Sequence, residues 1–231
     1  MANIRDVKES ENIRTTILFA AATLFVKNGF EATTVKEIAA EAGISISKLM
    51  YEVESKENIL CDLVTYVIEG QFRAATHLVE GRTSDPLFFY AVETVLQLHI
   101  AESSEQLRNI YTSAYSLPKT SDIIQHNLTG KLEHIFGKHL PNLETKDFYE
   151  LEIASGGIMR GFLTIPCDMY FTMERKARRF LETTFLVYRV PDETIQEIIE
   201  FVSQFDFPTI AEETVAQMLG FLNRSLDRVS N

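Results

Sequence analysis

The feature that most restricts the fold of this chain is the stretch from residue 33 to residue 56, TTVKEIAAEAGISISKLMYEVESK, which carries start and stop signals for two short helices. Thr34 can cap the first helix, and Glu37 three residues later completes a capping box. Gly43 ends that helix, because a residue without a Cβ atom readily takes the positive φ of a tight turn. Ser45 can then cap the second helix. The stretch therefore predicts a helix-turn-helix.

The two predicted helices, 35–41 and 46–51, each have an apolar side. Small Ala39 lets them cross closely, and Leu49 of the second helix points back at the first. An amphipathic helix over residues 10–28 is expected to pack behind the pair as a scaffold. The outer side of the second helix is then free to enter the groove of a nucleic acid.

The pattern from residue 13 to residue 60 is specific and has no gap. Its residues are Ile17, Leu18, Ala21, Ala22, Leu24, Phe25, Gly29, Phe30, Thr33, Thr34, Val35, Ile38, Ala39, Ala42, Gly43, Ile44, Ser45, Leu49, Val53, Ser55, Lys56 and Glu57. At these positions the sequence resembles the tetracycline-repressor (TetR) family of one-component regulators. The resemblance implies a three-helix DNA-binding head followed by a larger helical body that binds a ligand and forms a homodimer.

A protein of this kind is expected to be a transcriptional repressor that leaves a pseudo-palindromic operator in double-stranded DNA when a small-molecule effector binds. Two heads would read two half-sites, because one short helix contacts only a few base pairs. The residues expected to hold phosphates are Thr34, Lys36, Tyr51 and Lys56. Those expected to face base edges are Ser45, Ile46, Ser47 and Lys48.

The sequence departs from the family pattern just after Leu49. Met50 and Glu52 stand where the family has a tyrosine and then a tyrosine or histidine. A carboxylate at this edge of the helix would repel DNA phosphates, so the departure predicts weaker DNA binding there.

Composition sets further limits. The chain has 231 residues and a net charge of −11, the wrong sign for a protein that coats nucleic acid indiscriminately, although a specific binder is not excluded. Up to residue 60, seven basic and nine acidic residues leave the head at −2. The chain has no run of about 18 apolar residues, and its start is polar. We therefore expect a cytoplasmic protein with no membrane partner.

The fold class predicted for the whole chain is all-α, with a helix-turn-helix domain over residues 1–55 and an effector-binding and dimerisation domain over residues 56–231. A long helix over residues 56–80 would connect the two domains, and prolines fall between most of the later helices. The helices expected in the body are 86–101, 105–113, 119–139, 146–165, 173–189, 192–205 and 210–229.

No set of catalytic residues is visible. The sequence has no metalloprotease motif, no Cys-x-x-Cys, no glycine-rich phosphate loop and no nucleophile elbow. Cys61 and Cys167 are far apart and are expected to be free thiols. We therefore expect neither an enzyme nor a metal or cofactor site.

An effector pocket in the body would have mostly apolar walls with a few polar groups, and so would suit a partly apolar ligand. The candidate residues are His99, Tyr111, Tyr115, Met159, Arg160 and Thr164.

For several features of the body, the sequence leaves two interpretations open. Gly157 and Gly161 permit close approach either at a dimer interface or within one subunit. The basic run from Arg175 to Arg179 is expected to be a solvated helix face. The helices beyond Pro191 would either complete the dimer or cover the pocket.

The alternative to a regulator is a helical ligand-binding or protein-binding module whose head has lost DNA affinity. Met50, Glu52 and the net charge of the head are the reasons for considering it.

Overall fold

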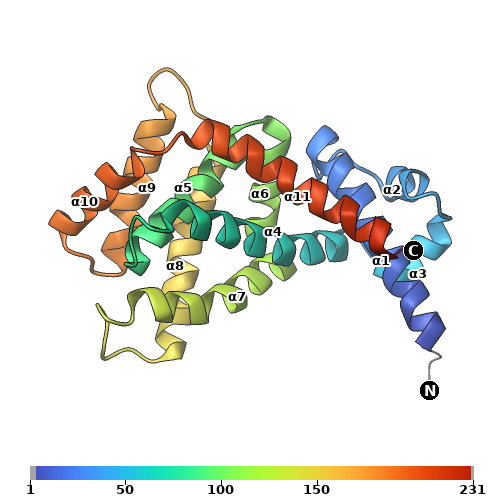
Figure 1. Ribbon diagram of the computed structural model, residues 1–231, viewed down its shortest axis with the longest axis horizontal. Coiled ribbons are helices and arrows are strands. Elements are labelled where there is room, and N and C mark those ends of the chain that lie inside the picture. Colours follow the sequence, from blue (N-terminus) through green and yellow to red (C-terminus); the bar gives the residue numbers. More distant parts are fainter. Residues whose placement is uncertain (1–3, 230–231) are drawn as a thin grey trace.

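The computed structural model describes the backbone of residues 4–229 and the side chains of residues 10–223, and every regular element in this part of the chain is an α-helix (Figure 1). This confirms the all-α prediction. The helices are α1 (Ile4–Asn28), α2 (Val35–Glu41), α3 (Ile46–Val53), α4 (Lys56–Val79), α5 (Pro86–Glu102), α6 (Glu105–Ser116), α7 (Pro118–Phe136), α8 (Thr145–Thr164), α9 (Met173–Val187), α10 (Asp192–Val202) and α11 (Phe207–Val229).

The helix-turn-helix forms through the predicted caps. The Glu37 backbone N–H donates to Thr34 Oγ1 at 3.2 Å, and the Thr34 N–H donates to the Glu37 carboxylate at 2.7 Å. Ser45 Oγ accepts a hydrogen bond from the Lys48 N–H at 3.1 Å. Gly43 has a φ of 67°, the left-handed conformation expected for the turn. Local backbone chemistry therefore fixes both ends of α2 and the start of α3.

The head does not end where α3 ends. Leu60, near the start of α4, belongs to the same apolar core as Phe25 of α1 and Leu49 of α3. Farther along α4, Ala75 belongs to the core of the body. Helix α4 is therefore one continuous element that contributes residues to the cores of both head and body.

Helix α5 is the centre of the body. It packs against α4 and against every helix from α6 to α11, so most of its residues are buried. Its polar residues Glu93, Thr94 and Gln97 are therefore inside the protein together with its apolar ones. Buried polar groups are the informative exceptions in a core, and they mark where a site can be built.

Helix α11 runs from the body back to the head, and it packs on α5, α4 and α1 (Figure 1). The Tyr66 hydroxyl of α4 donates a hydrogen bond to the Met218 carbonyl of α11 at 2.8 Å. This settles the position of the last helix: it lies across the body and does not extend away from it.

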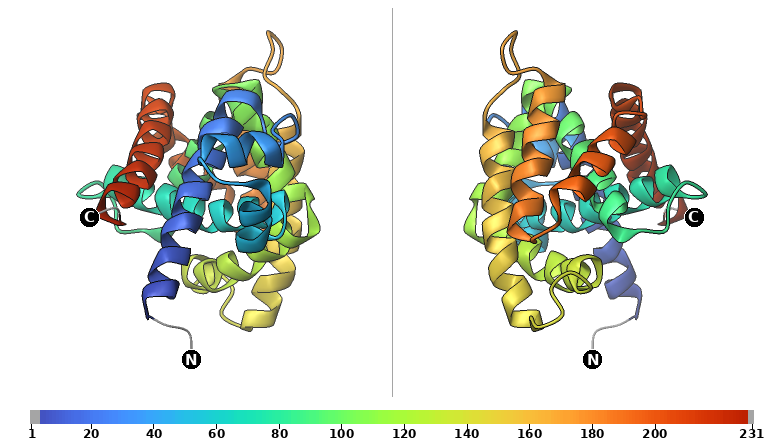
Figure 2. Two further views of the ribbon diagram at one scale, coloured as in Figure 1. Left: turned by 90° about the vertical axis from the view of Figure 1, so that its right-hand side faces the viewer. Right: turned by 90° about the vertical axis from the view of Figure 1, so that its left-hand side faces the viewer.

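Helices α8 and α9 lie side by side on the side of the body turned away from the head, facing the viewer in the right-hand view of Figure 2. The loop between them projects from the molecule (Figure 1), and Met169 and Tyr170 within it are 80% and 77% exposed.

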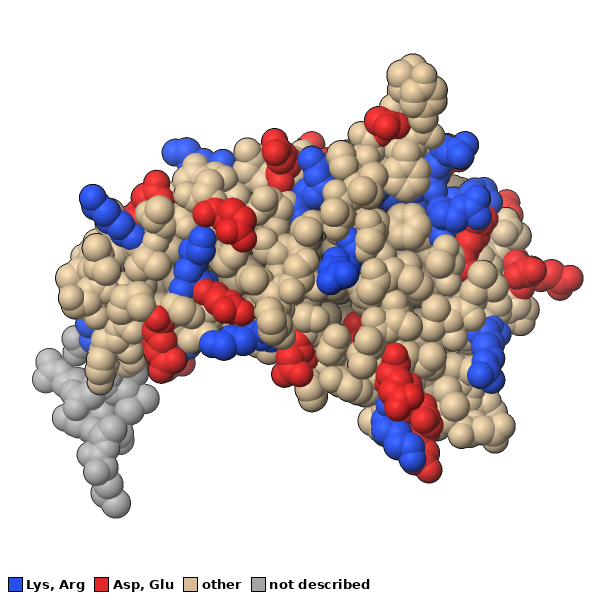
Figure 3. Space-filling view, turned by 180° about the vertical axis from the view of Figure 1, so that it is seen from behind, with Lys and Arg blue, Asp and Glu red and all other residues tan. Residues whose placement is uncertain are grey.

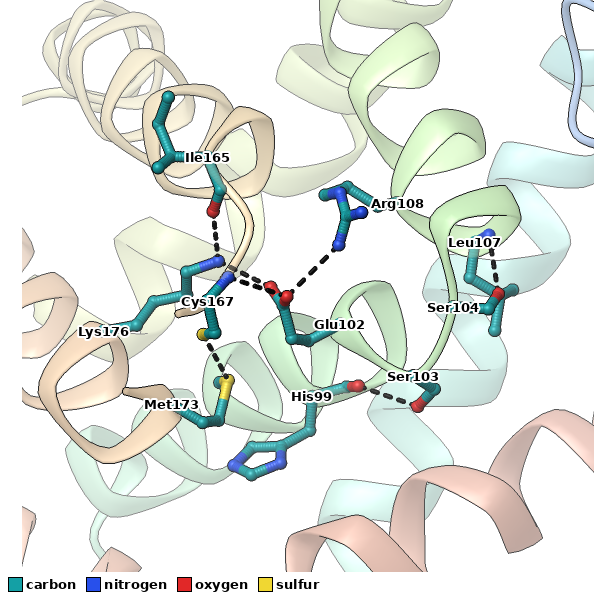
Figure 4. A network of polar contacts seen from close by, with 10 residues as sticks. All are labelled: His99, Glu102, Ser103, Ser104, Leu107, Arg108, Ile165, Cys167, Met173 and Lys176. Carbon is teal, nitrogen blue, oxygen red and sulfur yellow. Dashed lines mark hydrogen bonds and ion pairs between the residues drawn. The ribbon is translucent and has the colours of Figure 1, made fainter. Parts of the chain in front are cut away.

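A buried ion pair anchors this loop, and it corrects the prediction that the basic run of α9 is wholly solvated. The Lys176 side chain is only 1% exposed, and its ammonium donates to Glu102 Oε2 at 2.6 Å and to the Ile165 carbonyl at 2.5 Å (Figure 4). The Cys167 N–H and the Arg108 guanidinium donate to Glu102 Oε1. A buried lysine is tolerated here because its charge is fully partnered.

Candidate functional site

The outer face of the helix-turn-helix is built from side chains that the fold leaves in solvent. On α3, Ile46 is 47% exposed, Tyr51 is 80% exposed, and Ser45 and Ser47 are also exposed. Thr34 and Lys36 are exposed at the start of α2. The left-hand view of Figure 2 shows α2 and α3 at this end of the molecule. We call these six residues the recognition surface, and it contains six of the eight residues predicted to contact DNA.

Lys48 and Glu52 form an ion pair on α3, with Nζ and Oε1 2.8 Å apart. The Glu52 side chain is 4% exposed, and its other carboxylate oxygen accepts a hydrogen bond from Ser10 Oγ at 2.7 Å. The bonds from Lys48 and Ser10 hold the pKa of the Glu52 carboxyl below its usual range. The expectation that Glu52 faces DNA phosphates is therefore wrong, because its side chain turns toward α1.

Lys56 holds the loop between α1 and α2. Its ammonium donates to the backbone carbonyls of Phe30, Thr33 and Glu31 at 2.7, 3.0 and 3.4 Å, and it lies 4.3 Å from the centre of the Phe30 ring. All three donors of an ammonium are used in this way. The arrangement gives Lys56 a part in positioning α2 relative to α4.

No strong concentration of one charge is visible on the face of the molecule drawn in Figure 3. Lysines and arginines are mixed with acidic side chains over the face seen in Figure 3. In the head, Arg14 is paired with Asp62 at 2.7 Å. Any DNA contact must therefore come from the local placement of a few groups, because the general field of the protein is unfavourable.

The body contains a cavity of about 130 Å³ between α4, α5, α6, α7, α8 and α11. Its walls are mostly apolar. Ala22 and Phe25 of α1 also line it, so one wall belongs to the head. Met218 and Leu222 of α11 line another side, which makes α11 a cover of the cavity. The covering alternative for the late helices is therefore the one found for α11.

Two glutamine–tyrosine pairs supply polar groups to the cavity. The Gln71 amide of α4 donates to the Tyr111 hydroxyl of α6 at 2.8 Å. The Gln97 amide of α5 donates to the Tyr115 hydroxyl, also on α6, at 3.0 Å. All four residues line the cavity. Polar groups held in this way can orient a ligand inside an otherwise apolar site.

Two carboxyl groups also line the cavity. Glu93 of α5 is 6% exposed, and burial raises the pKa of its carboxyl to about 7. Glu152 of α8 is 3% exposed, and burial raises its pKa to about 8. Ser155 Oγ donates to Glu152 at 2.9 Å and lies 2.8 Å from the Tyr188 hydroxyl. Perturbed carboxyl groups in a cavity are typical of functional sites.

The structure brings together half of the residues predicted for the pocket. Tyr111, Tyr115 and Met159 line the cavity. The other three predicted residues do not. His99 stacks on Phe207 at 5.2 Å between ring centres, and burial lowers its pKa to about 4. Arg160 and Thr164 are on the exposed side of α8, so they lie outside this cavity.

Sequence reasoning missed the polar residues that matter most in this cavity. They are Gln71, Glu93, Gln97, Glu152 and Ser155. A signal existed for two of them, because Glu93 and Gln97 are four residues apart in the otherwise apolar run PLFFYAVETVLQLHIA. Two polar residues on one face of a buried helix point to a shared polar environment.

The free face of α8 carries a stripe of small and apolar residues at intervals of four: Ile153, Gly157, Gly161 and Ile165. The two isoleucines are 49% and 56% exposed. A Cβ atom added to either glycine would meet nothing within 4 Å, so neither glycine serves close packing within the subunit. Thr183 of α9 and Phe171 of the projecting loop border the same face.

None of the helices in residues 4–229 is both long and apolar enough to cross a membrane. No group of three or more histidine, cysteine or acidic side chains within the described part of the chain is arranged to hold a metal ion.

Comparison with known proteins agrees with the helix-turn-helix geometry. Residues 17–62 match the family model of the bacterial regulatory proteins, tetR family. The HTH-type transcriptional repressor KstR2 of Rhodococcus jostii (strain RHA1) is 36% identical over 101 residues, which are 42% of this chain and 50% of that protein. The HTH-type transcriptional regulator YerO of Bacillus subtilis (strain 168) is 26% identical over 193 residues, which are 76% of this chain and 62% of that protein.

The matches thus span about half to three fifths of the length of these two relatives. The crystal structure of RolR with its ligand resorcinol has a TM-score of 0.65 and 14% sequence identity, and it covers 86% of this chain and 97% of RolR. That likeness establishes the overall fold of head and body. Together with the family match, it shows that residues 17–62 are similar to the helix-turn-helix domain of the tetR family of bacterial regulatory proteins, within a chain that has the overall fold of RolR.

Proposed function

We propose that this protein is a DNA-binding transcriptional repressor that works as a homodimer and leaves its operator when a small molecule occupies the body cavity. The observation that carries the proposal is the recognition surface. Ile46, Ser47 and Tyr51 are exposed on a helix whose position is fixed by capping and by a buried core. Exposed polar and apolar side chains on such a helix suit the major groove.

In this proposal Ser45, Ile46, Ser47 and Lys48 face base edges, whereas Thr34, Lys36 and Tyr51 contact phosphates. Lys56 positions the head and is not assigned a direct contact, because three carbonyls already accept from its ammonium. Lys48 remains a candidate although it is paired with Glu52, because its side chain is 42% exposed and a long ammonium stem can turn toward DNA.

The face of α8 and α9 is the proposed dimer interface. Its glycines at 157 and 161 are open, and isoleucines flank them in the same stripe. Open glycines of this kind let a second helix approach closely, and the exposed isoleucines supply apolar area to bury. A two-fold dimer made through this face places two heads for two half-sites of an operator.

The cavity is proposed to control the heads by direct contact. Phe25 of α1 and Leu60 of α4 belong to the core of the head, and both line the cavity. A ligand that wedges against these residues favours a different angle between head and body. Such a ligand releases DNA only to the extent that it binds the displaced arrangement more tightly.

The rival function, a helical binding module without DNA affinity, loses one of its reasons because Glu52 turns away from the recognition surface. In this proposal the protein is a regulator and not an enzyme, and we place it in the cytoplasm, where operator DNA is found.

The test is selection of bound fragments from the genome that encodes this chain, using purified protein at low salt, followed by footprinting of the selected site. We expect one protected region with two related half-sites on opposite strands. Selection that returns no enriched fragment, with folded and dimeric protein, would contradict the proposal and favour the rival module.

A further inference from the structure

The cavity contains an unbalanced set of charges. Among the described residues that line it, two carry a carboxyl group, Glu93 and Glu152, and one carries an ammonium group, Lys131. When both carboxyls are ionised, the net charge of the lining is −1. The remaining walls are aliphatic and aromatic side chains with amide and hydroxyl groups, so they supply no compensating charge.

Of these three charged groups, the Glu93 carboxyl has the most unusual surroundings. Its side chain is within the body at the centre of α5, and the structure gives its carboxylate no hydrogen-bond partner among the described residues. Lys131 of α7 attracts it through space, but the lysine ammonium lies over the Phe72 ring, 3.8 Å from the ring centre. A carboxylate without a partner in apolar surroundings is costly, so such a group requires an explanation.

Glu152 of α8 lines the same cavity. It is held by Ser155, and the helix leaves room for it at Gly156, where an added Cβ atom would stand 3.3 Å from Glu152 Oε1. The Tyr115 ring borders the same point, at 4.0 Å from that Cβ position. The second carboxylate therefore has a fixed place beside an aromatic wall.

We propose that the effector of this protein is an organic monocation, a protonated amine on a compact apolar body, whose ammonium group binds Glu93 with Glu152 as its second carboxylate partner. The proposal rests on the proposed function, since it names the class of ligand for that cavity. A single positive charge would balance the lining and give Glu93 the hydrogen-bond donor it lacks. Tyr90, Tyr111 and Tyr115 offer ring faces that favour a cation.

Other ligand chemistries fit the cavity less well. An anion would add a third negative charge to a site in which only Lys131 is basic. A neutral ligand would leave both carboxyls to be buried with no net compensation, which favours their protonated forms. The cavity volume of about 130 Å³ is near the roughly 150 Å³ of an engineered apolar cavity that binds benzene. A ligand with one ring and a short amine chain is therefore the right size for a probe.

Binding of a cation should also release protons. Without a bound cation the environment favours the neutral form of both carboxyls. Glu93 faces Lys131, Tyr90, Tyr111, Tyr115 and Glu152, and Glu152 faces Ser155, Tyr188, Tyr90, Tyr115 and Glu93. A bound ammonium favours the ionised form, so each carboxyl that ionises releases a proton. Amine affinity is expected to rise between pH 6 and pH 8.5.

The experiment is isothermal titration calorimetry of the full chain without DNA, using three probes of one shape: 2-phenylethylamine, 2-phenylethanol and phenylacetate. We expect the amine to bind roughly tenfold or more tightly than the alcohol, and phenylacetate to bind least, as expected for a charge-assisted contact. Titrations in buffers of different ionisation enthalpy should show net proton release with the amine alone.

Single substitutions in the cavity test which side chains bind the amine. Glu93→Gln and Glu152→Gln keep the shape of the side chain and are each expected to weaken amine binding roughly tenfold, whereas Lys131→Met should strengthen it. Glu150→Gln, on the exposed side of α8, is the matched control and should change nothing. Circular dichroism confirms that each variant is folded.

Preference for the alcohol or for phenylacetate, amine affinity unchanged from the parent protein in both glutamine variants, or no amine binding at millimolar concentration would each overturn the proposal. Because the titration contains no DNA, its failure leaves the repressor assignment untouched. Failure of operator selection would likewise leave a positive amine result standing.

Discussion

Gly70 of α4 lies directly against Met218 of α11: a Cβ atom at position 70 would stand 2.9 Å from the Met218 sulfur. Because Met218 lines the cavity, this contact closes the cover that α11 forms over it. The fit depends on a residue without a side chain, which is why a helix-weakening glycine stands in the middle of α4.

Gly70→Leu is expected to push α11 away from α4 and to lower the free energy of unfolding by roughly 1–3 kcal/mol, the usual cost of overpacking. Adding Met218→Ala makes room for the new side chain and should restore most of the loss. Urea unfolding of the two variants and the parent checks this. Equal destabilisation in the single and double variants would show that Gly70 and Met218 are not coupled.

The Lys48–Glu52 pair predicts a non-additive effect on stability. Lys48→Ala leaves the buried Glu52 carboxylate with Ser10 as its remaining close partner, and should lower the free energy of unfolding by roughly 1–3 kcal/mol. Lys48→Ala combined with Glu52→Gln removes the uncompensated charge and should be more stable than Lys48→Ala alone. Thermal unfolding at pH 7.5 measures both, and strict additivity of the two substitutions would contradict the pairing.

Stability should fall as the pH rises through the range in which the two cavity carboxyls ionise. Glu93 and Glu152 keep their protons in the folded protein up to about pH 7 and about pH 8, whereas their reference pKa is 4.5. The folded state therefore binds more protons than the unfolded state between these values, and its advantage decreases with pH. His99, with a pKa near 4 against a reference of 6.5, acts in the opposite direction but only below about pH 6.5.

Raising the pH from 6.5 to 8.5 should lower Tm by roughly 5 °C for a chain of this size. Glu152→Gln should raise Tm at pH 8.5 and flatten the dependence, because the amide does not titrate. Differential scanning calorimetry in buffers of low ionisation enthalpy makes the comparison. A steeper dependence in Glu152→Gln than in the parent is the result that this explanation forbids.

The open glycines on α8 predict a variant that separates dimerisation from folding. Gly157→Arg should leave the subunit folded, since nothing lies within 4 Å of the new Cβ atom, yet place a charge in the proposed interface. Gly130→Arg on α7 is the matched control, because that glycine is equally open. Sedimentation velocity should show monomers for Gly157→Arg and dimers for Gly130→Arg. Dimers in both would place the interface elsewhere.

The ends of helices were predictable from the sequence where neighbouring residues cap the helix or form the turn. The Thr34 and Glu37 capping box and the Gly43 turn set the bounds of α2, and Ser55 sets the start of α4. These signals depend on neighbouring residues alone, so tertiary packing does not change them.

Side-chain direction was not predictable in the same way. Glu52 turns to α1 because of a serine 42 residues earlier, and Lys176 is buried because of a carboxylate 74 residues earlier. Glu152 reaches the cavity only because α8 crosses α5 and α6. Such partners are set by the packing of distant helices, and no local pattern in a single sequence identifies them.

The central claim is that the outer face of α3 reads DNA, and fluorescence anisotropy with the selected operator fragment tests it most directly. Tyr51→Ala and the double variant Ile46→Ala with Ser47→Ala remove exposed side chains, so Tm should be unchanged within about 1 °C. Operator affinity should fall roughly tenfold or more in each, as expected for lost phosphate and base contacts. Unchanged operator affinity in both folded variants would contradict the assignment of this face.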